Sequence, residues 1–276
     1  MGIQMNTNQR PWRLTSSLLL ASLALSCGGS EGRHRGDEEA AVDSMAQKQM
    51  QKQMQKQVLE AVVEVEAVKP GATAELNEGF EDEELDVSNF LVRFEGESRE
   101  VFSQREQIVQ ALHLKPGEAV ADIGSGTGFF SVLFAHEVGP KGRVFGVDIS
   151  SKFIDHLGER AFSLGLGQIK AVLCTDRSAM LKDASIDAAF ISDTYHHFEF
   201  PQDTLASLRS ALRPGGRLMI LDFNRIPGIT RPWMLNHVRC GRDDVIAEVE
   251  AAGFVLTGSP TVAGLVENYV LVFERP

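Results

Sequence analysis

Acidic residues and closely spaced glycines lie together at one point of the sequence. Gly124, Gly126 and Gly128 alternate with small polar residues and begin two positions after Asp122. Glycine lets the backbone approach a ligand closely, and a helix that begins after such a turn offers free N–H groups to it. Asp148 follows about 20 residues later, the spacing at which α/β cofactor-binding folds place the carboxylate that binds ribose hydroxyls. These residues predict a site for a nucleotide-type cofactor.

The elements that must position this site are two strands, a turn and a helix. Residues 119–123 are small or apolar apart from Asp122, as in a strand that is covered on both faces. Residues 129–138 carry apolar side chains at helical spacing, and residues 143–148 form a second strand that ends in an acid. Strand, glycine turn, helix and strand in this order predict an α/β fold with a parallel sheet.

Two adjacent histidines are candidate catalytic residues. His196 and His197 follow the predicted strand 188–192, at the end of the sheet where open α/β folds bind ligands. Imidazole titrates near neutral pH and can act as a general base. Either histidine could instead only hydrogen-bond the loop backbone, and the sequence leaves this choice open.

Four segments resemble motifs of one known family. Residues 120–128 and 147–150 resemble the first and second motifs of class I S-adenosylmethionine-dependent methyltransferases, and residues 185–193 and 212–222 are similar to the family's fourth and fifth strands. The resemblance covers residues 98–276. It implies a Rossmann-like doubly wound sheet of seven strands, mostly parallel with an antiparallel C-terminal strand and with helices on both faces. It also implies methyltransferase activity with S-adenosylmethionine as cofactor; an NAD-type α/β domain is the alternative.

The resemblance assigns roles to individual residues. Asp148 is expected to bind the ribose, and Asp122 to hold the glycine turn or the methionine ammonium of the cofactor. Asp176 lies where the family often contacts the adenine amino group, and Asp193 follows the fourth strand at the cofactor edge. The glycines of the turn complete the predicted cofactor-binding set, which contains no metal: Gly124, Gly126 and Gly128.

Two other functions stay open at this point. Asp193, Asp222 and Asn224 offer oxygen ligands that could hold Mg²⁺ for O-methylation, although Phe223 separates two residues that are adjacent in metal-dependent catechol-type methyltransferases. The second alternative is a non-catalytic cofactor-binding protein on the same fold. The acceptor is expected to be a small or lipid-like molecule. Candidates for the wall of its pocket are Tyr195, Phe198, Trp233, His237 and Arg239.

Residues 1–27 are predicted to be a lipoprotein signal peptide with its lipobox. Two arginines precede an apolar run at residues 18–25, which is too short to span a bilayer. Residues 23–27 resemble a bacterial lipobox, which implies cleavage before Cys27 and acylation of that cysteine; an ordinary signal peptide or an uncleaved anchor is the alternative. The predicted location is the cell envelope, lipid-anchored, and Gly28 resembles outer-membrane sorting in a two-membrane bacterium.

Composition restricts the partners and divides the rest of the chain. The formal charge is -11, from 27 basic and 38 acidic residues. This balance argues against nucleic acid as a partner, because phosphate binding needs a basic face. Residues 28–87, which hold glycines, acidic runs and Gln/Lys/Met repeats, are predicted to be a flexible tether. Residues 88–276 are predicted to be the methyltransferase domain, held at a membrane through Cys27.

Overall fold

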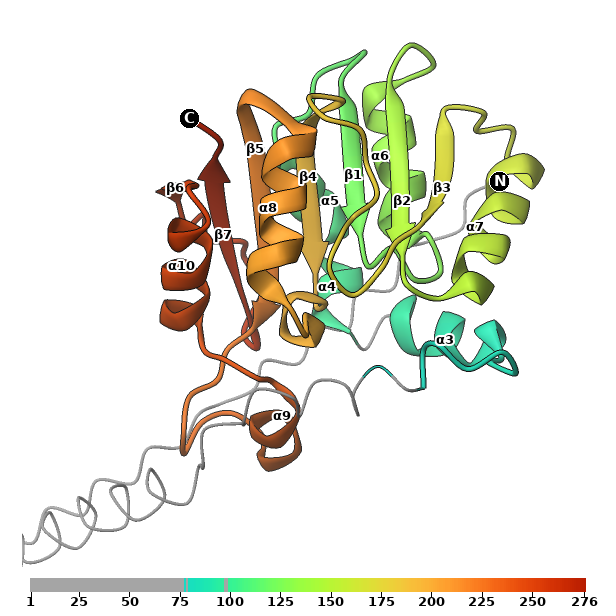
Figure 1. The fold of residues 1–276 in the computed structure, drawn as a ribbon. Coiled ribbons are helices and arrows are strands. Elements are labelled where there is room, and N and C mark those ends of the chain that lie inside the picture. Colours follow the sequence, from blue (N-terminus) through green and yellow to red (C-terminus); the bar gives the residue numbers. More distant parts are fainter. Residues whose placement is uncertain (1–76, 78, 97–98) are drawn as a thin grey trace, which may run out of the picture. The chain divides into compact units, whose positions relative to one another are not determined.

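The computed structural model describes residues 77, 79–96 and 99–276. The predicted signal peptide, Cys27 and most of the predicted tether lie outside the described residues. Figure 1 shows a central sheet with helices packed around it. Its strands are β1 Ala119–Ile123, β2 Arg143–Asp148, β3 Ile169–Leu173, β4 Ile186–Ser192, β5 Leu212–Phe223, β6 Val255–Gly258 and β7 Asn268–Glu274.

The sheet confirms the predicted fold class. Its seven strands have the order β3-β2-β1-β4-β5-β7-β6. Strands β1 to β5 pair in parallel, whereas β7 pairs antiparallel with both β5 and β6. The helices are α3 Val87–Phe94, α4 Glu100–Ser103, α5 Arg105–Ala111, α6 Phe129–Val138, α7 Ser151–Ser163, the 3₁₀ helix η1 Tyr195–His197, α8 Pro201–Ala211, α9 Pro232–His237 and α10 Arg242–Ala251.

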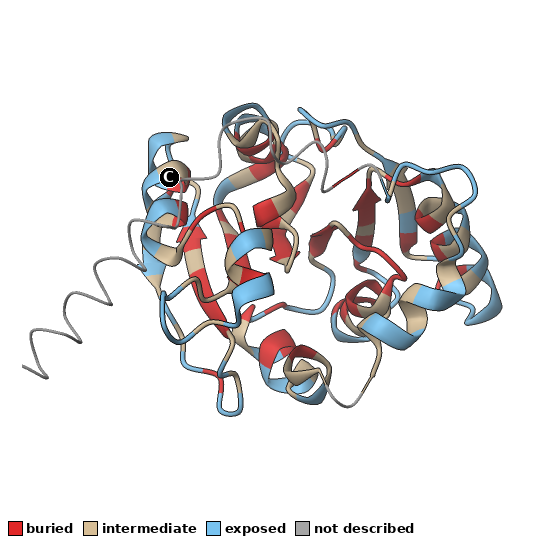
Figure 2. Ribbon diagram, turned by 90° about the horizontal axis from the view of Figure 1, so that it is seen from below, coloured by how far each residue is buried: buried red, intermediate tan, exposed pale blue. Residues whose placement is uncertain are grey.

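Strand β1 lies between two hydrophobic layers, one on each face of the sheet. Its five residues are all buried, as the apolar run predicts. Ala121 and Ile123 face the layer that contains side chains of α8 and α10, while Val120 faces the layer of α5, α6 and α7. Figure 2 shows buried residues along the strands and exposed ones on the outer faces of the helices. Burial on both faces therefore explains why β1 lacks the alternating pattern of a half-exposed strand.

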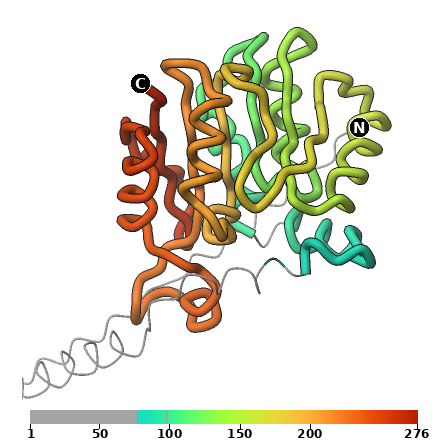
Figure 3. Tube along the Cα trace, viewed as in Figure 1, coloured from blue at the N-terminus to red at the C-terminus, as the bar shows by residue number. Residues whose placement is uncertain are grey.

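The strand register brings three predicted site segments to one edge of the sheet. Ile123 pairs with Val147 of β2 and with Ile191 of β4. The glycine turn after β1, Asp148 at the end of β2 and the β4–α8 loop therefore meet at the carboxyl edge. Figures 1 and 3 show α3, α4 and α9 gathered at this same end of the sheet. Segments from distant parts of the sequence thus surround the predicted cofactor site.

The segment that leads into β1 contains a break. The chain forms two short helices, α4 and α5, with a break at Gln104, whose φ and ψ are -100° and 11°. The Glu100 carboxylate accepts hydrogen bonds from three successive backbone N–H groups at residues 266–268, at 2.8 to 2.9 Å. Long-range contacts that the local sequence pattern does not reveal therefore hold α4 against the loop before β7.

The boundary between the tether and the domain also differs from the prediction. Asn77 donates a hydrogen bond to the His197 carbonyl at 3.0 Å, and the Phe80 ring lies 6.4 Å from the Phe153 ring. Packing on the domain thus begins before residue 88. Among the described residues, no helix combines the length and the apolar character that a membrane span requires.

Candidate active site

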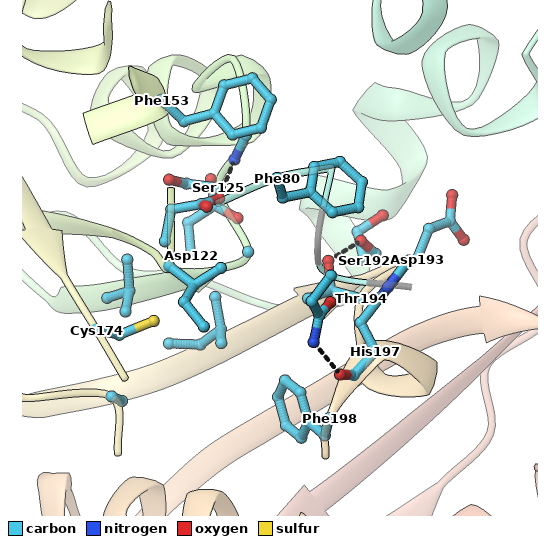
Figure 4. A pocket seen from close by; sticks show the side chains of 18 of the residues that line it. Phe80, Asp122, Ser125, Phe153, Cys174, Ser192, Asp193, Thr194, His197 and Phe198 are labelled. Carbon is cyan, nitrogen blue, oxygen red and sulfur yellow. Dashed lines mark hydrogen bonds between the residues drawn. The ribbon is translucent and has the colours of Figure 1, made fainter. Parts of the chain in front are cut away.

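A cavity of about 160 Å³ lies at the carboxyl edge of the sheet. Its walls include the glycine turn, Asp122, Asp148 and Asp176, together with Asp193 from the end of β4. Figure 4 shows the side chains that surround it, with aromatic rings from the N-terminal segment and from the β4–α8 loop. The structure therefore brings all the predicted cofactor-binding residues except Gly128 to one cavity.

The glycines of the turn are required by the packing of neighbouring side chains as well as by the expected approach of a ligand. Gly124 and Gly128 have φ of 68° and 78°. A Cβ atom at Gly124 would lie 2.3 Å from Thr194 Cγ2, and one at Gly128 would lie 2.4 Å from Leu157 Cδ1. These two glycines thus permit the β4–α8 loop and α7 to pack against the turn. The expectation that they admit a ligand misses this tertiary role.

Asp148 is bound into the turn by its carboxylate. The Gly126 N–H donates to Oδ2 at 2.8 Å, and the Ser150 N–H donates to Oδ1 at 2.9 Å. The side chain is buried, and burial raises the pKa of Asp148 to about 6. A carboxylate has about four lone-pair sites, so acceptor capacity remains for a ligand. This geometry suits the two adjacent hydroxyls of a ribose.

Asp122 is a second buried carboxylate beside the first. It accepts one hydrogen bond from Ser131 Oγ at 2.7 Å. Burial raises the pKa of Asp122 to about 7, and the charge of Asp148 adds to this shift. Within the described part of the chain, neither carboxylate forms a salt bridge with a basic residue. Such a pair favours a ligand with positive charge and many donors, which is what the sulfonium, ammonium and hydroxyls of S-adenosylmethionine provide.

The other two predicted cofactor residues differ in their surroundings. The Asp176 side chain is 41% exposed at the mouth of the cavity, 3.9 Å from Arg177. Asp193 is buried, pairs with Arg99 and accepts a hydrogen bond from Asn268 Nδ2 at 2.5 Å. Asp176 is therefore free to meet a polar ligand group, whereas Asp193 already has two partners from the chain. Sequence reasoning missed both partners, because neither lies near Asp193 in the sequence.

His196 is the better oriented of the two candidate bases. Its Nδ1 lies 2.7 Å from Asp222 Oδ1, and its backbone N–H donates to Asp222 Oδ2 at 3.1 Å. Burial disfavours the imidazolium, but the charge and hydrogen bond of Asp222 outweigh burial and raise the pKa of His196. A carboxylate on Nδ1 fixes the tautomer and directs Nε2 away from it.

His197 lines the cavity but is a weak base. Burial, followed by the neighbouring His196 and His237, lowers the pKa of His197 to about 2. A base of this pKa takes little part in proton transfer near neutral pH, since general bases work best when their pKa lies near the working pH. His196 is thus the stronger base of the two, but it is 1% exposed and does not line the cavity, whereas His197 does. The catalytic role of either histidine stays a prediction.

The predicted pocket wall is correct only in part. Phe198 lines the cavity, whereas Tyr195 is fully buried in the core and donates to Glu248 at 2.7 Å. Arg239 binds the same carboxylate through two hydrogen bonds, at 2.7 and 2.8 Å. Tyr195 thus connects the β4–α8 loop to α10, Arg239 binds the same carboxylate from the α9–α10 connection, and neither residue lines the cavity. Trp233 is 54% exposed on α9.

The arrangement of the acidic residues does not support the Mg²⁺ alternative. Asp193 is held by Arg99 and Asp222 by His196. The Asn224 side chain points its amide toward the Val266 carbonyl, at 3.4 Å. An oxygen cage for Mg²⁺ needs these oxygens to converge on one point, and here each has a different partner.

A cover over the cavity was missed by sequence reasoning. Phe80 and Phe94 lie at 6.4 Å from the Phe153 ring and line the cavity. Glu95, directly after α3, binds Arg160 of α7 through both carboxylate oxygens and accepts from Thr127 Oγ1 at 2.7 Å. These contacts fasten the N-terminal segment to the glycine turn. Only the spacing of the phenylalanines could have signalled it.

Comparison with known proteins agrees with this site. Residues 114–251, half of the 276 residues, match a family model described as "Methyltransferase domain". An uncharacterized 37.1 kDa protein in transposon TN4556 of Streptomyces fradiae is 34% identical over 118 residues, which are 43% of this chain and 34% of that protein. The ubiquinone/menaquinone biosynthesis C-methyltransferase UbiE of Pseudomonas fluorescens is 30% identical over 113 residues, 41% of this chain and 44% of that enzyme. The chain thus spans less than half the length of these relatives.

Solved structures show the same fold. A S-adenosylmethionine-dependent methyltransferase from Aquifex aeolicus has a TM-score of 0.60 at 24% identity, covering 68% of this chain and 97% of that one. Geranyl diphosphate C-methyltransferase from Streptomyces coelicolor, solved with S-adenosylhomocysteine, has a TM-score of 0.54 at 17% identity, covering 72% and 87%. The family match and these neighbours support S-adenosylmethionine as the cofactor, as predicted. By its family match and its fold, the chain belongs to the methyltransferase-domain family.

Proposed function

We propose that this protein is an S-adenosylmethionine-dependent methyltransferase. The observation that carries the proposal is the buried Asp148 carboxylate, held by the Gly126 N–H at the carboxyl edge of β1 and β2. Beside it lies Asp122, which forms no salt bridge among the described residues. When bound, S-adenosylmethionine supplies an already activated methyl group. The chain therefore has to bind the cofactor and the acceptor, orient them and exclude water. Alignment of the two reacting atoms supplies most of the rate.

The described residues divide these tasks. Asp148 accepts the ribose hydroxyls, and Asp122 offsets the positive charge of the cofactor. The aromatic cover of Phe80 and Phe94 limits access of water to the cavity. His197 lines the cavity on the side of the β4–α8 loop, next to His196, which Asp222 orients.

The test has two steps on the purified full chain. Calorimetry with S-adenosylmethionine measures binding, and methyl-tritiated S-adenosylmethionine with small-molecule and lipid extracts then measures transfer. Label that moves to an extract component in the wild type, and fails to move in Asp148→Ala, supports the proposal. A folded chain that does not bind S-adenosylmethionine rejects it.

A second candidate function is cofactor binding without methyl transfer. It is favoured by the low pKa of His197, which makes the cavity-lining imidazole a poor base. In addition, a structure named as the [4+2]-cyclase SpnF shares the fold, with a TM-score of 0.55 at 16% identity over 63% of this chain and 81% of that one. Binding of S-adenosylmethionine with no transfer to any extract fraction supports this second function.

For the acceptor, we propose a small or lipid-like molecule. Two similar proteins carry names that mention quinone biosynthesis and geranyl diphosphate, which are compounds with apolar chains. In this chain, the segment 224–241 exposes apolar side chains: Ile226, Ile229 and Trp233. An apolar molecule gains roughly 25 cal/mol for each Å² of surface removed from water, so such residues suit a lipid-like acceptor. Transfer of label to aqueous extracts alone would contradict the lipid-like choice.

We propose in addition that the protein is anchored in the cell envelope through acylated Cys27. The support is the lipobox-like segment that follows a basic and apolar leader. Cleavage before Cys27 would remove Arg10 and Arg13 and no acidic residue, which changes the formal charge from -11 to -13. Mass spectrometry of the mature N-terminus, with fractionation of wild type and Cys27→Ser, tests this. A soluble protein that retains an intact Met1 would contradict it.

A further inference from the structure

Three histidines converge beside the cavity, from two segments of the chain. His196 and His197 belong to η1, and His237 ends α9. Each ring offers a nitrogen, and the three nitrogens lie within 4.8 Å of one another. The ring centroids are 4.3, 5.0 and 5.2 Å apart. About 40 residues separate the two segments, so the fold and not the local sequence builds this cluster.

Two of the three histidines each have a buried ring nitrogen without a hydrogen-bond partner among the described residues. His196 is 1% exposed, its Nδ1 is engaged by Asp222, and its Nε2 is buried without a hydrogen-bond partner in the described part of the chain. His197 Nδ1 is likewise buried and unpartnered among the residues described. Leaving a buried polar nitrogen unsatisfied is costly, and such groups in proteins are rare unless they bind a water or an ion.

We propose that His196, His197 and His237 together bind one divalent transition-metal cation of the zinc type. Imidazole nitrogen is a preferred ligand of Zn²⁺ and its neighbours in the first transition row, whereas Mg²⁺ prefers oxygen. At a Zn–N distance of about 2.0–2.1 Å, tetrahedral ligands lie about 3.3 Å apart. The observed separation of up to 4.8 Å therefore requires only a small closure of the rings.

Asp222 holds the His196 ring by its Nδ1 atom, which leaves Nε2 to face a cation. Histidines that bind metals usually donate their second ring N–H to a carboxylate, which fixes the ring and strengthens it as a ligand. The 2.7 Å contact between His196 Nδ1 and Asp222 Oδ1 has this geometry. Asp222 is itself held by the backbone N–H groups of His196 and Phe223, at 3.1 and 2.8 Å. The pair is thus positioned before any cation binds.

The site also indicates a class of acceptor, a step that rests on the proposed function. Three protein ligands leave a fourth position on a tetrahedral cation, and His197 places the cluster at the cavity wall. A hydroxyl or thiol acceptor can occupy that position and lose its proton to solvent more easily there. Its lone pair then forms the bond to the methyl carbon, while the electrons of the broken C–S bond remain on sulfur. The acceptor class is therefore an alcohol, phenol or thiol.

The experiment measures metal binding without relying on turnover. The purified full chain is stripped with EDTA and titrated with Zn²⁺, counted by elemental analysis, and with Co²⁺, whose visible spectrum reports four-coordinate binding. One equivalent is expected. His237→Ala and His197→Ala should each weaken binding at least about 100-fold, and Asp222→Asn about 10- to 100-fold. His136→Ala is the matched control, because this exposed histidine of α6 lies outside the cluster and the cofactor site.

The outcomes separate this inference from the proposed function. A folded wild-type chain that takes up no stoichiometric Zn²⁺ or Co²⁺ overturns the metal site. So does binding that is equal in His237→Ala and His136→Ala. Stoichiometric metal without S-adenosylmethionine binding keeps the site and rejects the methyltransferase proposal. Methyl transfer that is unchanged in the stripped enzyme rejects the metal's role toward the acceptor.

Discussion

Removal of the Asp148 carboxylate should weaken cofactor binding by a magnitude that follows from its contacts. The carboxylate already accepts from Gly126 and Ser150, and its remaining lone pairs can accept the two ribose hydroxyls. Hydrogen bonds to a charged group contribute about 1.5–3 kcal/mol. Asp148→Ala should therefore bind S-adenosylmethionine at least about tenfold, and up to about 150-fold, more weakly.

Isothermal titration calorimetry on wild type, Asp148→Ala, Asp148→Asn and Asp155→Ala isolates this effect. Asp148→Asn keeps one acceptor oxygen and should lie between wild type and Asp148→Ala. Asp155→Ala removes the same charge from an exposed position of α7 and should leave affinity unchanged. Asp148→Ala also leaves the Gly126 and Ser150 N–H groups unpaired, so its melting temperature must be measured in parallel. An affinity within about threefold of wild type, in folded Asp148→Ala, would refute the assignment of the ribose site.

Three further predictions concern pH, the glycine turn and the cover. Burial raises the pKa of Asp148 from 3.8 to about 6 and that of Asp122 from 3.8 to about 7. Without ligand, the stability that the two protonated side chains contribute to the fold is therefore complete below about pH 4 and is lost as the pH rises through 6 to 7. A cationic cofactor needs the ionised forms, so calorimetry should show affinity falling as the pH drops from about 7.5 to 5.5; pH-independent affinity would contradict this. Gly128→Ala should destabilise the fold by about 2–4 kcal/mol in urea unfolding, because a Cβ there has a positive φ and meets Leu157. Gly139→Ala should cost less, because Gly139 has a φ of 69° but open space around it. Equal losses of stability in the two variants would show that packing adds nothing. Glu95→Ala removes the ion pair with Arg160 and the hydrogen bond from Thr127, which together contribute about 1–3 kcal/mol. Hydrogen exchange of the α3 amides should therefore become about 5- to 150-fold faster. Unchanged exchange rates would mean that other contacts hold the cover.

The sequence predicted the sheet well because its signals are local. The apolar run of β1, the turn that follows and the acid at the end of β2 each lie within one short segment. Helix α6 runs over residues 129–138 as its spacing predicts. Parallel strands that are buried on both faces leave few alternatives to an α/β fold.

The site was predicted less completely because several of its contacts join distant segments. The partners of Asp193 come from residues 99 and 268, and the third histidine lies 40 positions after His197. Tyr195 was expected in the pocket wall, but its hydroxyl reaches Glu248 in α10. An aromatic residue beside a catalytic loop looks the same in sequence whether it faces a ligand or the core. Only tertiary packing decides between them.

The central claim is that the cavity beside Asp148 and the glycine turn binds S-adenosylmethionine. The most direct measurement is calorimetry of the purified wild-type chain with S-adenosylmethionine, S-adenosylhomocysteine and NADH under the same conditions. We predict one site per chain for each of the first two ligands. NADH should bind at least about 100-fold more weakly than S-adenosylmethionine, since the turn lacks the glycine spacing of dinucleotide folds. Tighter binding of NADH than of S-adenosylmethionine would contradict it.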